Sequence, residues 1–431
     1  MAVGVPGTVA GLEAIHKKFG TLPWKDLVQP AIDLALNGYR VTAKQQLSFD
    51  SKKDEFIEMN GENTFYAKGF KAGDWVKNRA LANTLGRIAK NGSAGFYEGV
   101  NADAMIKRIK ETGGVMTAED LLAYKPVWRD PIHIKYEDLD LYSMAPPSSG
   151  GICLGQIMKM IEPFNLKSFG HNSTDYIKLL VEAERRSFAD RSHFLGDPDF
   201  ISIPTKRLTS TDYLNNRMKD FSFEKPTDSN DIGHGNIDIH ESNETTHYSI
   251  VDQFGNAIAV TTTLNGTFGS KLFSNELGFF LNNEMDDFSS KPGYPNMYGL
   301  IGGEANKIEP KKSPLSSMSP VIVTKDNIPY LITGSPGGST IINSVFQEII
   351  NILDFEMSLE ESSNKNRIHY QWQPDIVFYE DLKKDIVERL ENDFILRKRK
   401  LGEIQSILKT LDGYKGYSDS RRPDGKSIEI H

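Results

Sequence analysis

Hydrophobic positions follow two different periods along the chain, and the period changes near residue 245. In the first half, apolar residues recur at helical spacing, as in residues 79–92, where Leu81, Leu85 and Ile88 fall on one face. After residue 245, apolar and polar residues alternate, which is typical of half-buried strands. The pattern therefore predicts a helix-rich part followed by a part built from β-hairpins.

Capping and turn residues mark the ends of the predicted helices. Pro23 and Asn37-Gly38 bound one helix, and Asn91-Gly92 ends another. Thr117 and Asp120 have the spacing of a capping box. Further helices are expected after the stretch APPSSGG (145–151), over 173–197 and over 340–353, and a hairpin is expected over 131–144.

A change of composition separates the two parts. It begins near residue 205, and residues 225–244 are polar with few large apolar side chains, so they are predicted to form a loop or linker. Two β-runs then flank the turn Gly255-Asn256, and a second hairpin over 319–339 runs into glycines. No period of 20 to 50 residues recurs. The order predicts a sandwich of sheets covered by helices rather than two independent domains.

Composition narrows the function classes. The net charge of −8 argues against nucleic acid or an anionic membrane as the main partner, and no apolar run is long enough to span a bilayer. Cys153 is the single cysteine, which excludes an internal disulfide and a cysteine-based zinc site, and we expect it to be a packing residue. The first twenty residues do not read as a signal peptide. The nine histidines show no HExxH pattern, and we expect no metal and no cofactor.

The joint between the two parts carries the sequence NETTHYSIVD, residues 243–252. A threonine hydroxyl inside a chain is a poor nucleophile, whereas at a free N-terminus the α-amine, with a pKa of about 8, can take its proton. Cleavage between Glu244 and Thr245 would create such a terminus, with a cleavable polar loop before it and a strand after it. The alternative is that Thr245 and Thr246 simply favour extended structure.

Three further motifs are each compatible with more than one function. GSPGGS, residues 334–339, could bind phosphate, stabilise an oxyanion or form a plain tight turn, although it lacks P-loop spacing. The acids of NNEMDDFS (Glu284, Asp286, Asp287) could bind an ammonium group or a cation, be solvated, or act as glycosidase carboxylates. Ser316-Ser317 could bind a carboxylate or cap a turn.

Taken together, these segments resemble the γ-glutamyltranspeptidase family of N-terminal-nucleophile hydrolases. The matching stretches occur in the family's order and are GVPGTVAGLE, YSMAPPSSGGI, DRSHFLGDPDF, ESNETTHYSIVD, LNNEMDDFS, PNMYGLIGGEANKIEPKKSPLSSMSP, TGSPGGS and RIHYQWQPD. The resemblance implies an α+β fold, specifically a four-layer αββα sandwich. It also implies self-cleavage before Thr245 into a large subunit (1–244) and a small subunit (245–431), each the other's partner.

The resemblance implies a reaction and a set of roles. Thr245 would attack the γ-carbonyl of glutathione or another γ-glutamyl compound, and the γ-glutamyl ester would pass to water or to an amino acid or dipeptide. The resemblance implies that Thr263 supports the nucleophile and that Gly337 and Gly338 form the oxyanion hole. The donor's α-amino group would be bound by Asn265, Glu284 and Asp287, and its α-carboxylate by Ser316 and Ser317. Tyr298 would be a lid residue that contacts Asn265, and Arg367 and Arg421 would take part in maturation.

The resemblance also implies an N-terminal segment before GVPGTVAG, with export signals, opening strands and an arginine that clamps the substrate α-carboxylate. No arginine of this chain matches that clamp, so the chain is expected to be an N-terminally incomplete member. A charge-assisted contact of this kind contributes about 1.5–3 kcal/mol, so substrate binding should weaken tenfold or more. The family implies the periplasm or the cell exterior. The alternatives are a non-catalytic remnant of the fold, a relative that hydrolyses another amide such as a β-lactam side chain, and, more distantly, nucleotide binding through GSPGGS.

Overall fold

The computed structural model describes residues 2–229, 231–232, 245–297 and 299–429. The described residues group into two compact units, each built from two separate stretches of chain: unit 1 is Met1–Trp128 with Leu264–Met285, and unit 2 is Arg129–Thr263 with Asp286–His431. The sequence did not predict this division. The two units also differ from the two predicted subunits, because the subunits are separated by the cleavage of one peptide bond and the units are defined by their compactness.

Unit 1 is mainly helical. Its elements are α1 (Thr8–Phe19), α2 (Trp24–Asn37), β1 (Tyr39–Arg40), α3 (Ala43–Asn60), η1 (Phe65–Lys68), β2 (Trp75–Val76), α4 (Arg79–Asn91), α5 (Ala94–Tyr97), α6 (Gly99–Glu111), α7 (Ala118–Ala123), β7 (Phe273–Ser274) and β8 (Phe279–Phe280). The predicted helix ends at Gly38 and Gly92 are confirmed, as is the capping box of Thr117 and Asp120. Local capping chemistry therefore fixes these helices where the sequence places them.

Unit 2 contains the main sheet. Its elements are β3 (Ile132–Tyr136), β4 (Leu139–Ser143), α8 (Gly150–Ile161), α9 (Leu166–Phe169), α10 (Thr174–Phe194), α11 (Thr205–Leu208), α12 (Thr211–Met218), β5 (Thr245–Val251), β6 (Ala257–Thr263), η3 (Glu304–Asn306), β9 (Val321–Lys325), β10 (Ile328–Thr333), α13 (Thr340–Leu353), α14 (Leu359–Asn364), β11 (Ile368–His369), β12 (Val377–Tyr379), α15 (Lys384–Leu390), β13 (Leu396–Lys398), β14 (Gln405–Thr410) and β15 (Gly413–Ser418). The short helix η2 (Glu284–Asp287) spans the division between the units.

Six strands of the described chain form this sheet in the order β15-β14-β10-β9-β4-β3, with every neighbouring pair antiparallel. The three predicted hairpins, β3–β4, β5–β6 and β9–β10, are confirmed. Alternate residues of β4 and β9, among them Leu141, Val321 and Val323, are fully buried in the main hydrophobic core. Alternation in the sequence therefore reports which face of the sheet is covered.

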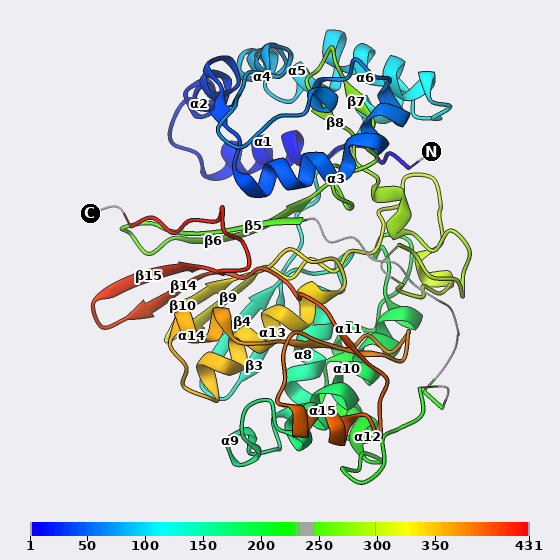
Figure 1. Cartoon of the computed structure of the whole chain (residues 1–431), viewed down its shortest axis with the longest axis vertical. Coiled ribbons are helices and arrows are strands. Elements are labelled where there is room, and N and C mark those ends of the chain that lie inside the picture. The colour runs from blue at the N-terminus through cyan, green and yellow to red at the C-terminus, as the bar shows by residue number, and fades with distance from the viewer. Residues whose placement is uncertain (1, 230, 233–244, 298, 430–431) are drawn as a thin grey trace. The chain divides into compact units, whose positions relative to one another are not determined.

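Helices α8, α10 and α13 cover one face of the sheet, and the β5–β6 hairpin lies on the other (Figure 1). Close packing of α8 needs glycine, because a Cβ at Gly151 would lie 2.6 Å from the carbonyl oxygen of Met144. Cys153, in the same helix, is fully buried as expected, and burial raises the pKa of its thiol to about 11. The described part of unit 2 thus has a helix layer and two β-layers.

Two other regions differ from or extend the expectations. Residues 205–218, where the composition begins to shift, form the short helices α11 and α12, and the described residues of 219–229 contain no helix or strand. The remainder of the predicted loop, 233–244, lies outside the described residues. Among the helices that are described, none combines the length and the hydropathy needed to cross a membrane.

Candidate functional site

Thr245 is the first residue of β5, and Thr263 is the last residue of β6. The two residues are direct partners in the antiparallel register, and the Thr245 hydroxyl donates to the Thr263 hydroxyl over 3.4 Å. The Thr245 side chain is buried, whereas Thr246 points to solvent. The hairpin therefore holds the predicted nucleophile rigidly, with the hydroxyl of its predicted supporting residue beside it.

His247 follows Thr245 on the same buried side of β5. Its Nε2 lies 3.1 Å from the Ser249 hydroxyl and its Nδ1 lies 2.9 Å from the Thr261 hydroxyl. Because the Ser249 hydroxyl donates to the carbonyl of Gln405, we assign His247 Nε2 as the donor to Ser249 and Nδ1 as the acceptor from Thr261. Burial lowers the pKa of His247 to about 3. The ring is therefore neutral near pH 7 and serves as a packing and hydrogen-bonding group.

The GSPGGS loop begins against this histidine. A Cβ at Gly334 would lie 2.2 Å from His247 Cε1, so the imidazole packs directly on the loop backbone. Further along, Gly337 and Gly338 have φ values of 135° and 55°, which disfavour any side chain. The loop then enters α13, where the Thr340 hydroxyl donates to the Gly337 carbonyl over 2.8 Å. Through His247 and Gly334, the structure joins the strand of Thr245 to the loop predicted to form the oxyanion hole.

Residues 403–405 hold this loop from the other side. The Gln405 amide donates to the Gly334 carbonyl over 3.0 Å, and the Glu403 amide donates to the Ser335 hydroxyl over 2.9 Å. The Ser335 hydroxyl in turn donates to the carbonyl of Pro336. The loop is thus bonded to the start of β14 as well as packed on β5.

Arg367 and Arg421 belong to a buried ion-pair network that reaches the same region. Both pair with Asp419, at 2.9 Å from Arg367 Nη2 and 3.0 Å from Arg421 Nη1, and Arg421 also pairs with Glu380. Asp419 additionally accepts from the Ile404 amide over 3.1 Å. The structure therefore gives both arginines a supporting position behind the loop, while their implied part in maturation stays a prediction.

Ser316 and Ser317 lie beside the stretch PPSSGG that precedes α8. The amide and the hydroxyl of Ser149 both donate to the Ser316 carbonyl over 2.8 Å. The Ser316 amide donates to the Pro147 carbonyl over 2.9 Å, and the Ser148 hydroxyl donates to the Met318 carbonyl over 2.7 Å. Backbone pairing of two distant segments therefore fixes the position of the serine pair.

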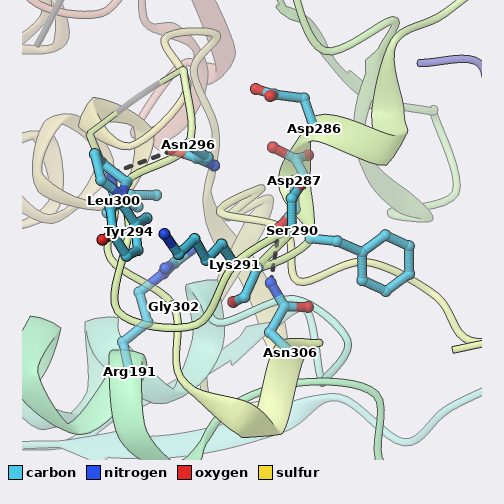
Figure 2. A pocket seen from close by; sticks show the side chains of 13 residues that line it. Arg191, Asp286, Asp287, Ser290, Lys291, Tyr294, Asn296, Leu300, Gly302 and Asn306 are labelled. Carbon is cyan, nitrogen blue, oxygen red and sulfur yellow. Dashed lines mark hydrogen bonds between the residues drawn. The ribbon is translucent and has the colours of Figure 1, made fainter. Parts of the chain in front are cut away.

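A cavity of about 100 Å³ in unit 2 is lined by Arg191, which contacts Ser317 of this pair. Charged side chains of both signs line it: Arg191 and Lys291 are cationic, and Asp286 and Asp287 are anionic. Figure 2 shows Arg191 pointing from its helix towards the loop that carries Lys291, with the two aspartates on an adjoining segment. Arg191 Nη2 donates to the Ser317 hydroxyl over 3.2 Å. The structure therefore brings one buried arginine into contact with Ser317 and into the same cavity lining as Asp287.

Asn265 and Glu284 belong to unit 1. Asn265 has a positive φ of 70°, and its side-chain amide donates to the Asn283 carbonyl over 3.0 Å. The Glu284 amide is held by the Asn282 side chain, and burial raises the pKa of the Glu284 carboxyl to about 7. The Asn265 side chain is thus bonded to Asn283, the residue before Glu284. Glu244 and Tyr298 lie outside the described residues.

Sequence reasoning assigned no role to His247, Ser149 or Arg191, and it named Gly334 only as part of the GSPGGS motif. Arg191 sits in VEAERRSFADRSHF, where charged residues occur on every face of the helix, so its spacing does not distinguish it from a solvated arginine. The available signal for His247 was its place two residues after Thr245 in an alternating strand. Within the described residues, no three histidine, cysteine or acidic side chains converge as a metal site would require.

Comparisons with known proteins bear on this site. A family model described as γ-glutamyltranspeptidase matches residues 1–428. The chain is 43% identical over 433 residues to the glutathione hydrolase proenzyme of Escherichia coli (strain K12), covering 98% of this chain and 74% of that protein. It is 41% identical over 440 residues to the protein of the same name from Pseudomonas aeruginosa, covering 100% of this chain and 77% of that protein.

Solved structures give the fold. A cephalosporin acylase from Bacillus halodurans superposes with a TM-score of 0.82 at 23% identity, over 97% of this chain and 77% of its own. A γ-glutamyltranspeptidase from Helicobacter pylori aligns at 37% identity with a TM-score of 0.51, over 53% of this chain and 66% of its own. The first likeness shows the mixed α/β fold alone, and the predicted four-layer order of that fold stays a prediction.

Proposed function

Because the chain belongs to the γ-glutamyltranspeptidase family, an enzyme family of glutathione hydrolases and γ-glutamyltransferases, we propose that it matures by cleavage between Glu244 and Thr245. The mature protein transfers the γ-glutamyl group of glutathione and related compounds to water or to an amino acid or dipeptide. The observation that carries this proposal is the buried Thr245 hydroxyl at the start of β5, paired with Thr263. The name proenzyme, which its bacterial relatives bear, supports the cleavage step.

Acyl transfer begins at the freed N-terminus. The Thr245 amine takes the hydroxyl proton, and the Thr245 oxygen attacks the γ-carbonyl carbon of the donor. Backbone N–H groups at Gly337 and Gly338 stabilise the negative oxygen of the tetrahedral intermediate. The intermediate collapses to a γ-glutamyl ester, and the leaving amine takes the proton from the Thr245 ammonium. Water or an acceptor amine then attacks the ester and releases Thr245 for the next cycle.

The donor's α-amino acid head group requires ligands of two kinds. Asn265, Glu284 and Asp287 bind the α-ammonium, because an amide oxygen and carboxylates are the acceptors that an ammonium needs. Ser316 and Ser317 donate hydroxyl hydrogen bonds to the α-carboxylate. Tyr298 acts as a lid residue over Asn265. Support for the serine pair comes from its fixed backbone position and from the hydrogen bond of Ser317 with Arg191, a residue that lines a cavity with charges of both signs.

The wider proposal follows from the family. Cleavage yields a large subunit (1–244) and a small subunit (245–431) that stay associated in the four-layer αββα sandwich of N-terminal-nucleophile hydrolases. Arg367 and Arg421 support maturation. The site of action is the periplasm or the cell exterior.

Two single substitutions test the nucleophile. Thr245→Ala should abolish both maturation and turnover of L-γ-glutamyl-p-nitroanilide, and denaturing electrophoresis should then show one band near the full mass of 48.3 kDa. Thr246→Ala is the matched control, because Thr246 is the adjacent threonine of the same strand and is exposed. N-terminal sequencing of the small fragment should begin at Thr245. An intact wild-type chain without turnover would instead identify a non-catalytic relative, and wild-type fragments in the Thr245→Ala variant would refute the proposal.

A further inference from the structure

Asn282 and Asn283 are adjacent buried asparagines that precede Glu284, and each is bonded to a different segment of unit 1. Their exposed fractions are 5% and 8%. Asn282 Oδ1 accepts from the Gly4 amide over 2.9 Å and from the Glu284 amide over 3.1 Å, and its Nδ2 donates to the Gly4 carbonyl over 2.9 Å. One side chain therefore joins the backbone of Gly4 to the backbone of Glu284.

Residues 2–4 lie against Glu284. The Met285 amide donates to the Ala2 carbonyl over 3.1 Å. A Cβ at Gly4 would lie 3.5 Å from the Cβ of Glu284, so the two backbones are in close contact. The stretch contributes to the burial that raises the pKa of the Glu284 carboxyl to about 7. The bonds to Gly4 therefore fix both the backbone of Glu284 and the stretch that covers its side chain.

Asn283 is bonded to three successive residues that follow β6. Its amide donates to the Leu264 carbonyl over 3.1 Å, its Oδ1 accepts from the Gly266 amide over 2.8 Å, and its carbonyl accepts from Asn265 Nδ2 over 3.0 Å. Asn265 and Gly266 are buried, and the φ of 70° places Asn265 in the left-handed region, so its conformation depends on these bonds. The Asn283 side chain therefore holds the backbone from which the Asn265 side chain projects.

The carbonyl of Asn283 also sets the direction of the Asn265 amide. A carbonyl oxygen only accepts, so the Nδ2 end of the Asn265 side chain must face Asn283 and the Oδ1 end must face away from it. An ammonium group needs an acceptor, which Oδ1 supplies and Nδ2 does not. The arrangement therefore suits the proposed contact of Asn265 with the α-ammonium of the donor.

We propose that Asn282 and Asn283 are positioning residues for the α-ammonium of the γ-glutamyl donor. Asn283 presents the Asn265 amide oxygen, and Asn282 fixes Glu284 against residues 2–4. The assignment rests on the proposed function and adds two residues that act through its ammonium ligands. Each asparagine therefore serves recognition of the donor's amine and not of its carboxylate.

The test compares three p-nitroanilides that differ only at the head group. L-γ-Glutamyl-p-nitroanilide carries both α-groups, glutaryl-p-nitroanilide lacks the amine, and 4-aminobutanoyl-p-nitroanilide lacks the carboxylate. In Asn282→Ala and in Asn283→Ala, the kcat/KM preference for the γ-glutamyl over the glutaryl substrate should fall about tenfold, the lower end of the worth of a charge-assisted contact. The preference for the γ-glutamyl over the 4-aminobutanoyl substrate, which reports the carboxylate, should stay within about twofold. An equal loss for all three substrates would mean a merely structural role and would overturn the assignment.

Two further variants separate this role from stability. Each preference is a ratio measured on one preparation, so it does not depend on the folded fraction. Asn283→Asp keeps an oxygen that accepts from the Gly266 amide, so it should recover most of the amine preference lost in Asn283→Ala. Asn101→Ala removes a buried asparagine of unit 1 that is bonded to Arg87 and Gly95, and it should leave both preferences unchanged. A comparable fall in Asn101→Ala, or no recovery in Asn283→Asp, would overturn the assignment.

Glutamine variants keep the test decisive if an alanine variant does not accumulate. Asn282→Gln and Asn283→Gln retain the amide but move it by one methylene, which displaces it from its partners. The amine preference should then fall as expected for alanine. An unchanged preference in both glutamine variants would overturn the assignment.

A binding measurement distinguishes failure of this assignment from failure of the proposed function. Calorimetry should show that wild type binds L-glutamate more tightly than glutarate, and that Asn282→Ala and Asn283→Ala reduce this difference. If wild type hydrolyses no γ-glutamyl amide but the variants reduce the difference, the function is wrong and the two asparagines still position a site for an α-ammonium. If turnover is present and the amine preference survives in both alanine variants, the function stands and the assignment is wrong.

Discussion

Replacing Gly334 with alanine should destabilise the junction between β5 and the GSPGGS loop. The new Cβ would lie 2.2 Å from Cε1 and 2.3 Å from Nδ1 of His247, while the backbone of Gly334 is outside the left-handed region and accepts alanine. The cost is therefore one of space alone. Overpacking costs about 1–3 kcal/mol, and displacing the ring from Thr261 and Ser249 adds about 1 kcal/mol for each hydrogen bond.

The expected total is about 3–5 kcal/mol, which should lower the apparent Tm of a 431-residue chain by about 3–6 °C in a thermal melt. The γ-glutamyl-p-nitroanilide rate should also fall, because the loop carries the proposed oxyanion donors. His247→Ala supplies the decisive comparison, since it removes the ring that alanine at 334 would strike. The double variant should melt no lower than His247→Ala alone. Additive losses in the double variant, or a wild-type Tm for Gly334→Ala, would refute the contact as the cause.

Three other perturbations have defined outcomes. Burial raises the pKa of the Glu284 carboxyl to about 7, and only the ionised carboxylate binds an ammonium. The kcat/KM for γ-glutamyl-p-nitroanilide should therefore rise with pH up to about 7, and Glu284→Gln should remove this rise. Identical pH profiles for the two proteins would contradict the role. Asp419→Asn breaks two buried ion pairs and should cost about 3–5 kcal/mol in a melt, whereas Asp412→Asn, at an exposed pair with Lys415, should cost less than about 1 kcal/mol. Cys153 should resist Ellman's reagent in the native protein and react fully in denaturant, because it is buried and its pKa is raised to about 11; rapid native labelling would contradict its position.

Local signals account for what the sequence predicted about the fold. A capping residue acts within one turn of its own helix, so the boundaries at Pro23, Gly38 and Gly92 could be read directly. Alternation acts within one strand, so the three hairpins could be read as well. The two-unit division could not be, because it depends on Leu264–Met285 packing with residues from the start of the chain. Packing between segments that are far apart in the chain produces no periodic pattern in the sequence.

The same limit applies to the site. The local sequence made Thr245 a candidate beside the plainer interpretation that it favours extended structure, and the resemblance selected it and supplied the remaining roles. Arg191 could not be found, since its meaning comes from Ser149 and Ser317, which lie 42 and 126 residues away. His247 likewise gains its importance from Gly334, a neighbour only in space. The role of a residue that depends on such distant partners can be identified only from the three-dimensional structure.

The ion pairs of Asp419 connect the last described residues of the chain to the GSPGGS loop. One carboxylate restrains Arg367, Arg421 and the Ile404 amide together, and the next residue, Gln405, is bonded to Gly334. Displacing residues 419–429, whether by a protease, an antibody or a fused tag, would therefore loosen the backbone that holds the GSPGGS loop without touching Thr245. Placement of affinity tags at this end should be judged by turnover as well as by yield.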